Sequence, residues 1–115
     1  MSNFITLKNS REFGSVYSTK NSVANKYLVM YVLENQLDSN RLGISVSKKV
    51  GNSVIRHHLT RLIRESYRLN KEMFNSGLDI VVIARESAKD RKYKEIESAL
   101  LHLGKINGIL NEKSM

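Results

Sequence analysis

The feature that most constrains this chain is a basic segment, residues 41–68, with the sequence RLGISVSKKVGNSVIRHHLTRLIRESYR. It contains seven Lys or Arg and a single acid, Glu65, so it carries +6 of the chain's formal net charge of +8. Four bases oppose three acids before the segment, and eight bases oppose seven acids after it. Charge concentrated in this way is typical of a surface that binds a polyanion.

Within the basic segment, the pattern predicts a strand that leads into a helix. The β-branched run LGISVS is typical of a strand. Gly51 allows a sharp turn, and Asn52 or Ser53 can cap a helix from Val54 to about Leu69. At about 100° per residue, one stripe of this helix is aliphatic and faces the core: Ile55, Leu59, Leu62 and Ile63. A separate arc is polar and mostly cationic: Arg56, His57, Thr60, Arg61, Arg64 and Arg68.

Two explanations are open for this cationic arc, a solvated helix face or a phosphate-binding face. Glu65 is the only acid that can form an i,i+4 pair, with Arg61, so salt bridges along the helix do not explain the arc. Unpaired arginines repel one another, and their forked guanidinium groups suit phosphate oxygens. The pattern therefore favours phosphate binding.

Composition limits the class of protein. The 115 residues include no cysteine, which excludes disulfides and thiolate metal sites and suits a reducing compartment. No apolar run approaches the length of a membrane span, and the opening MSNFITLKNS lacks the apolar core of a secretory signal. We therefore expect one domain over residues 1–115, in the cytoplasm. An isoelectric point near 9.9 points first to nucleic acid.

The rest of the chain predicts an α+β fold. Asn9 or Ser10 can cap a helix from Arg11 to about Ser18. Further strands are expected over 22–33 and 78–84, and Arg41 is expected to begin a hairpin partner of the first. A last amphipathic helix is expected over 93–110, with these side chains inward: Ile96, Leu100, Leu103 and Ile106.

The predicted order is α-β-β-α-β-α, with helices layered on a small mixed sheet. The strand 78–84 is short and β-branched, which predicts a central position in that sheet. The connection through the basic helix should join parallel strands, and general handedness rules make it right-handed.

Phe13 and Tyr17 lie four residues apart on one face of the first helix, where they can pack in the core or stand at the rim of a groove. Spacing alone favours the core by about two to one.

No motif in the sequence indicates an active site within the protein. His57 and His58 are adjacent on a helix and do not chelate one metal as an i,i+4 pair can, and His102 stands alone. Ser45 and Ser47 have no base near them in sequence. We therefore expect no catalytic residue in this chain.

The run RLGISVSKKVGNSVIR, followed by Arg61 and Arg64, closely resembles the signature of the bacterial ribonuclease P protein component. The upstream segment EFGSVYSTKNSVANKYLVMYVL and the downstream segments DIVVIAR and YKEIESALLHLGKI resemble the same family in the same order. The resemblance covers nearly the whole chain. It implies a ribosomal-protein-like, two-layer α/β sandwich with a left-handed crossover, contrary to the general handedness rule.

The resemblance also implies the function. The family is the small protein subunit of a ribonucleoprotein endonuclease that removes the 5′ leader from precursor tRNA, with the chemistry carried by the RNA. Its partners would be the catalytic RNA and the single-stranded leader, and neither a membrane nor DNA. Mg²⁺ would serve the holoenzyme and be bound mainly by RNA.

Site residues follow from the same resemblance, position by position. Contacts to the catalytic RNA fall on Lys48, Lys49, Arg56, Arg61 and Arg64. His57 is added because it can still donate a hydrogen bond, and Arg68 is added from the helical arc alone. Aromatic residues that line a leader-binding cleft match Phe13, Tyr17 and Tyr31, which replaces the core interpretation of the first two. Polar residues beside them would bind leader phosphates: Ser45, Ser47 and Lys49. Metal ligands stay unassigned.

Two positions depart from the family pattern. His57 stands where the family usually has Asn, and Thr60 where it usually has Lys. Loss of one lysine removes about one phosphate contact. The alternative function is a structural RNA-binding protein, of the ribosomal or assembly-factor type, without a role in cleavage. A nuclease that uses His57 or His58 itself is disfavoured because no carboxylate lies near them at metal-site spacing.

Overall fold

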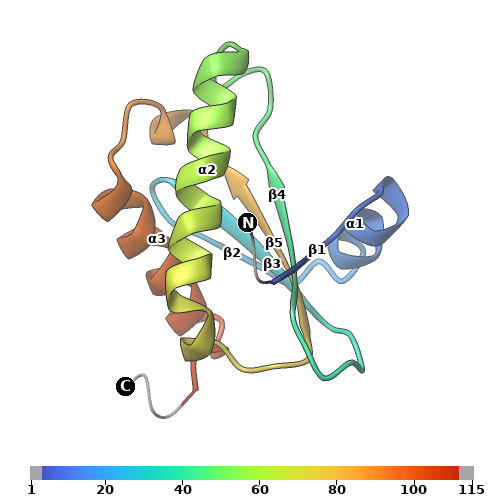
Figure 1. Ribbon diagram of the computed structural model, residues 1–115. Coiled ribbons are helices and arrows are strands. Elements are labelled where there is room, and N and C mark those ends of the chain that lie inside the picture. The colour runs from blue at the N-terminus through green and yellow to red at the C-terminus, as the bar shows by residue number, and fades with distance from the viewer. Residues whose placement is uncertain (1–3, 112–115) are drawn as a thin grey trace.

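The computed structural model describes residues 4–111, which form one mixed sheet with helices on both faces (Figure 1). The strands are β1 (Ile5–Thr6), β2 (Ser22–Ala24), β3 (Leu28–Glu34), β4 (Arg41–Ser45) and β5 (Leu78–Ala84). The helices are α1 (Ser10–Tyr17), α2 (Ser53–Asn70) and α3 (Tyr93–Ile106), with short 3₁₀ turns η1 (Lys71–Met73) and η2 (Glu86–Ala88). The α+β class and the helical extents of α1 and α2 agree with the predictions.

β5 lies at the centre of the sheet, whose strand order is β1-β4-β5-β3-β2. It pairs in parallel with β4 and antiparallel with β3. The predicted hairpin between the strand expected over 22–33 and the strand at Arg41 is wrong, because β5 is inserted between β3 and β4. The predicted parallel crossover from β4 through α2 to β5 is confirmed.

This crossover is left-handed. In Figure 1, β4 and β5 run in the same direction, α2 lies in front of them, and β5 lies to the left of β4. The right-handed expectation from general rules is therefore wrong, and the hand implied by the family resemblance is confirmed. α1 packs against Val81 on one face of β5, and α2 crosses on the opposite face, over the core that contains Ile80 and Val82.

The segment predicted as one long strand over 22–33 is a hairpin of two strands. The side-chain oxygen of Asn25 accepts hydrogen bonds from the backbone N–H groups of Tyr27 (3.2 Å) and Leu28 (3.0 Å). This turn reverses the chain, so that β2 pairs antiparallel with β3. β1, only two residues long, was not predicted; it pairs in parallel with β4.

Helices α2 and α3 enclose the main core against one face of the sheet. The predicted stripe of α2 is partly confirmed, since Leu59 and Ile63 are buried while Ile55 and Leu62 are half-buried. On α3, three of the four predicted inward residues are fully buried: Ile96, Leu100 and Leu103.

The predicted end of the last helix is wrong. Ile106 is 52% exposed and is the final residue of α3. Asn107 caps the helix and Gly108 follows with φ of 70°, a conformation that ends helices and favours glycine. Leu110 then forms an isolated bridge with Phe74 instead of a further helical turn.

Candidate nucleic-acid interface

The turn between β4 and α2 projects two lysines into solvent. The N–H of Val50 donates to the carbonyl of Ser47 (3.1 Å), and the Val50 side chain is buried, which anchors the turn. Lys48 and Lys49, between these two residues, are exposed. The turn therefore presents both ammonium groups beside the start of α2.

The N-terminus of α2 is capped as predicted, with the side chain of Asn52 accepting from the N–H of Ile55 (3.0 Å). Gly51 is needed for a reason different from the predicted one. Its φ is not positive, but a Cβ there would lie 2.9 Å from two atoms of the Ile55 side chain. Close packing of Ile55 onto the turn thus fixes how α2 leaves the sheet.

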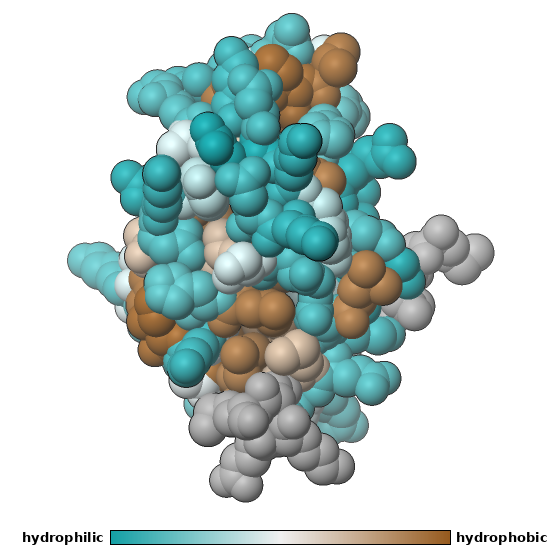
Figure 2. Space-filling model, turned by 90° about the vertical axis from the view of Figure 1, so that its left-hand side faces the viewer, coloured by the Kyte–Doolittle hydropathy of each residue, from teal (hydrophilic) through white to brown (hydrophobic). Residues whose placement is uncertain are grey.

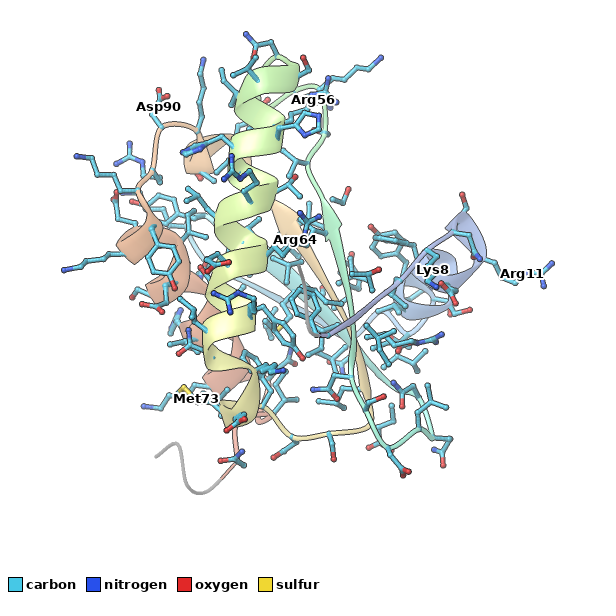
Figure 3. All side chains as sticks on the ribbon, viewed as in Figure 1. Lys8, Arg11, Arg56, Arg64, Met73 and Asp90 are labelled. Atoms are coloured by element: carbon cyan, nitrogen blue, oxygen red, sulfur yellow. The ribbon has the colours of Figure 1, made fainter. Side chains whose placement is uncertain are left out.

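We call Lys48, Lys49, Arg56, Arg61 and Arg64 the cationic face. Arg61 and Arg64 are exposed, while Arg56 is half-buried and donates from Nε to the carbonyl of Gly51 (3.3 Å). Figure 3 shows Arg56 near the first turn of α2 and Arg64 further along the same helix. None of the five forms a salt bridge with another residue in 4–111. Their charges are available to a polyanion.

Arg68 differs from the cationic face because it is paired. Its Nε donates to Glu65 (3.0 Å), and a second guanidinium nitrogen binds the other carboxylate oxygen. The hydrogen bond from Arg68 lowers the pKa of Glu65 below its ordinary value. Glu65, the acid that could form an i,i+4 pair with Arg61, pairs instead with the residue three positions later.

Arg41 belongs to the basic segment by sequence but is engaged within the fold. Its Nε and one terminal nitrogen bind the two carboxylate oxygens of Asp79 at 2.8 and 2.7 Å. Its other terminal nitrogen donates to Glu12 of α1 (3.0 Å), and Asn35 also donates to Asp79 (2.9 Å). Burial tends to raise the pKa of Asp79, but the hydrogen bonds from Arg41 and Asn35 lower it overall. Arg41 therefore links α1 to the sheet.

The two positions that depart from the family pattern have different environments. His57 is exposed next to the cationic face and is free to donate to a ligand. Thr60 is half-buried, and its hydroxyl donates to the carbonyl of Arg56 (2.9 Å). Thr60 thus satisfies its hydroxyl within the helix, whereas a lysine would extend a charge from this position.

On the opposite face of the sheet, three aromatic rings meet under α1. The ring centroids of Tyr17 and Tyr31 lie 5.1 Å apart in an edge-on arrangement, and those of Phe13 and Tyr17 lie 6.4 Å apart. All three are half-buried around Val16 and Val81. We call Phe13, Tyr17 and Tyr31 the aromatic surface. Its rings are neither fully buried, as a core position requires, nor fully exposed, as at the rim of a groove.

Gly43 allows the aromatic surface to reach β4. A Cβ on Gly43 would lie 2.7 Å from the Phe13 ring, so only glycine lets this ring rest directly on the strand. Ser45, two residues later on the same side of β4, is half-buried, and Ser47 and Lys49 follow in the exposed turn. The structure thus places all of the predicted leader-binding residues on α1, on β3, or on β4 and the turn that follows it.

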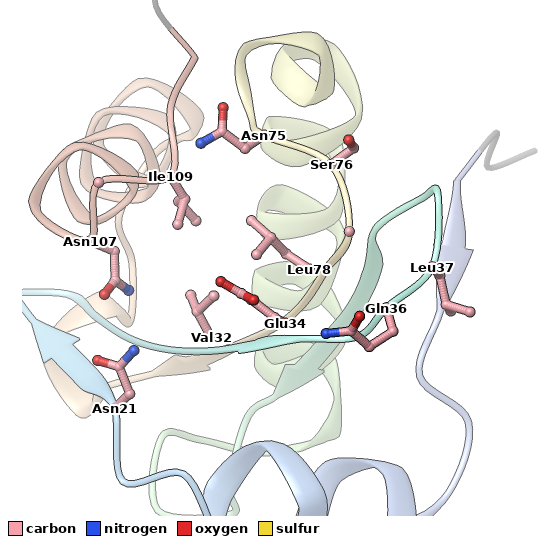
Figure 4. Close-up of a pocket in the computed structure, with 12 residues that line it drawn as sticks. Asn21, Val32, Glu34, Gln36, Leu37, Asn75, Ser76, Leu78, Asn107 and Ile109 are labelled. Carbon is pink, nitrogen blue, oxygen red and sulfur yellow. The ribbon is translucent and has the colours of Figure 1, made fainter.

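A hollow of about 490 Å³ lies at the other end of the sheet, where sequence analysis predicted no site. Glu34, Asn75 and Asn107 border it, together with apolar side chains of β3, β5 and the segment after α3 (Figure 4). No Lys or Arg lines it. It therefore lacks the cations that would bind an RNA backbone.

Within residues 4–111, no group of three or more His, Asp or Glu side chains could hold a metal ion. In the same part of the chain, no helix has the length and apolar character needed to cross a bilayer.

The fold and these surfaces define a small α+β protein of the RNA-binding class, with unpaired cations on one helix and half-exposed aromatic rings on the opposite face of the sheet. The family model described as Ribonuclease P matches residues 1–107. The chain belongs to the ribonuclease P protein family, which is associated with RNA binding and tRNA processing.

Individual relatives agree with this assignment. The ribonuclease P protein component of Lachnoclostridium phytofermentans is 63% identical over 106 residues, covering 92% of this chain and 91% of the relative. The structure of the Staphylococcus aureus RNase P protein matches with a TM-score of 0.84 at 41% identity, covering 92% of this chain and 97% of that one. For the Thermotoga maritima RNase P protein the TM-score is 0.81 at 33% identity, with coverage of 88% and 96%.

Proposed function

We propose that this chain is the protein subunit of a ribonuclease P ribonucleoprotein that removes the 5′ leader from precursor tRNA. A catalytic RNA carries the chemistry, and the protein binds that RNA and the leader. The observation that supports this proposal best is the cationic face, five side chains on one turn and one helix that have no acid partner among residues 4–111.

The cationic face contacts the phosphates of the catalytic RNA. Like charges on adjacent turns destabilise a free helix, and an RNA backbone that neutralises them removes this cost. Arg61 and Arg64 offer forked donors for phosphate oxygens, and His57 adds a further donor on the same side. Arg68 contributes less, because Glu65 already occupies its guanidinium group.

The aromatic surface accepts the single-stranded leader. Tyr17 and Tyr31 are half-buried, so part of each ring is fixed by packing and part can stack on a base. Stacking on aromatic faces does not demand a particular base, which suits a subunit that processes many precursors. Ser45, Ser47 and Lys49 supply polar contacts to the leader backbone.

Mg²⁺ serves the holoenzyme through the RNA. The described residues offer no cluster of side chains that fits a magnesium ion, so we assign no magnesium ligand to this protein and derive no step from one. The contribution of the protein is to hold RNA and substrate through the two surfaces.

The deciding experiment is single-turnover cleavage of a precursor tRNA at low magnesium. We compare a catalytic RNA alone, with this protein, and with the variant Arg61→Ala/Arg64→Ala. The wild-type protein should stimulate leader removal, and the variant should require a higher protein concentration for the same rate. Lys105→Ala, which removes an exposed charge near the far end of α3, should behave as wild type.

A protein that binds RNA yet stimulates no catalytic RNA would contradict this proposal and favour the structural RNA-binding alternative. Cleavage by the protein after rigorous removal of RNA would instead support a nuclease active site in the chain.

A further inference from the structure

An apolar slot lies beside the cationic face, between the first turns of α2 and the start of α3. Its volume is about 480 Å³, and α2 lines it with Val54, Ile55, His58, Leu59 and Leu62. Val54 is 75% exposed, an unusual position for an aliphatic side chain on a charged helix. Figure 2 shows hydrophobic surface surrounded by hydrophilic residues at the end of the molecule where α2 begins. We call this feature the α2–α3 slot.

The slot is continuous with the cationic face. A second hollow of about 340 Å³ shares His58 and Leu62 with the slot and extends along α2 to Arg61 and Arg64. A chain of phosphates bound along the cationic face therefore passes directly by the mouth of the slot.

The walls of the slot suit a flat heterocycle. Tyr93 and His58 contribute planar rings, and Leu59 and Leu62 provide an apolar floor. The Tyr93 hydroxyl donates to Glu97 (2.9 Å), which fixes the ring, and burial raises its pKa, so it remains neutral. For a base that leaves its stack, contacts with these rings and apolar side chains replace the lost base–base stacking.

The rim of the slot is mixed in charge. Lys92 is exposed at one side and Arg61 lies near the other, while Arg91 is already paired with Glu95 (3.5 Å). Asp90 is exposed at the same end, with φ of 66° and no hydrogen bond or ion pair to another residue in 4–111 (Figure 3). A free carboxylate at the rim of an otherwise basic surface can accept hydrogen bonds from an exocyclic amine of a base.

We infer that the α2–α3 slot holds one unstacked base of the RNA bound by the cationic face. Arg61 and Lys92 bind the phosphates on either side of that nucleotide, and Asp90 accepts from the amine of the base. The inference rests on the proposed RNA-binding function and adds to it a contact that reads a base. A second copy of this chain, with its own charge of +8, does not fit the basic rim as RNA does.

The absence of tryptophan from the chain allows a direct test. Val54→Trp places a single fluorophore on the outer wall of the slot, at an exposed position where folding tolerates it. The matched control is Ile106→Trp, another exposed aliphatic residue, at the far end of α3. Addition of an in vitro transcribed ribonuclease P catalytic RNA should quench Val54→Trp and protect it from acrylamide, and should leave Ile106→Trp unchanged.

A second variant separates a specific contact from general electrostatics. Glycine adopts the left-handed backbone at position 90 without strain, so Asp90→Gly removes both the charge and the hydrogen-bond acceptor. Loss of an acid from an RNA-binding rim should tighten binding if charge alone matters. If the carboxylate accepts from a base, RNA binding should weaken about fivefold.

The inference is overturned if Val54→Trp and Ile106→Trp respond alike to RNA, or if Asp90→Gly binds more tightly than wild type. Failure of the wild-type protein to bind any catalytic RNA would instead overturn the proposed function, and this site with it.

Discussion

Arg41 and Arg61 stand in the same basic segment, and the fold uses their charges in opposite ways. The Arg41 guanidinium forms salt bridges with Asp79 and Glu12, where α1, β4 and β5 meet. Arg61 is exposed and has no salt bridge within residues 4–111. The comparison shows that the cationic side chains of the basic segment form two groups. One group stabilises the fold, and the other is available to a ligand.

The difference arises from strand register. Arg41 lies directly opposite Asp79 in the parallel pairing of β4 with β5, 38 residues apart in sequence. Asp79 is 2% exposed, so its charge needs a partner. The arginines of α2, in contrast, form no salt bridge with a strand residue within 4–111, and in that range only Glu65 pairs with one of them.

The first prediction tests the salt bridge between Arg41 and Asp79. Arg41→Met leaves the Asp79 carboxylate buried without its main partner, so the free energy of unfolding should fall by about 3 kcal/mol in a urea titration. Arg64→Met should change it by less than about 0.5 kcal/mol. The double variant Arg41→Met/Asp79→Asn should be more stable than Arg41→Met, because the unpaired charge is gone. Equal losses for Arg41→Met and Arg64→Met would contradict the distinction.

The same pair has a defined pH dependence. The pKa of Asp79 is lowered in the folded state, so its contribution is present above the unfolded carboxyl pKa of about 3.9 and is lost as the pH falls through the folded value. The gap in unfolding free energy between wild type and Arg41→Met should therefore narrow below about pH 4.

The second prediction tests the arginines that are available to a ligand. Arg61→Ala/Arg64→Ala should make the slope of log K against log salt for RNA binding flatter by about two units, because two phosphate contacts are lost. The unfolding free energy should not fall, since both side chains are exposed and neither forms a salt bridge within residues 4–111. Filter binding at several salt concentrations measures the slope. An unchanged slope would show that phosphates do not contact these two residues.

The third prediction extends the comparison to the aromatic surface, which binds without charge. Tyr17→Leu keeps an apolar side chain against Val16 and Val81 but removes the ring. Affinity for precursor tRNA should fall about tenfold, and affinity for mature tRNA without a leader should not change. Tyr27→Leu changes another half-buried tyrosine, one that packs against the main core, and serves as the control. Equal effects on both tRNAs would exclude a leader contact.

Local signals in the sequence predicted the parts of the fold that depend on local physics. Asn9 and Asn52 cap α1 and α2 because an amide oxygen can accept from the first free N–H groups of a helix. The β-branched run at 78–84 correctly indicated a central strand. The cationic arc of α2 followed from helical periodicity, and its exposed members are where that periodicity places them.

Other features depend on partners distant in sequence and could not be predicted locally. Nothing near Arg41 indicates Asp79, so charge counting grouped Arg41 with the other cations of the basic segment, although the site assignment did not include it. The insertion of β5 between β3 and β4 is likewise a non-local choice.

The turn at Asn25 and the helix end at Gly108 did carry local signals, an Asx turn and a glycine after asparagine, which the hydrophobic pattern obscured.

The smallest predicted effect tests the borderline case, Arg68, which lies on the cationic arc yet is paired. Glu65→Gln removes the salt-bridge partner of Arg68, so the Arg68 guanidinium becomes available to RNA. RNA affinity at low salt should rise about two- to threefold, and the salt slope should steepen by up to one unit. An exposed i,i+3 pair contributes little to stability, so the melting temperature should barely change. Arg68→Gln in the wild-type background should weaken binding only slightly, but in the Glu65→Gln background it should abolish the gain. If Glu65→Gln tightens binding equally with and without Arg68, the gain comes from the lost acid alone, and Arg68 does not contact the RNA.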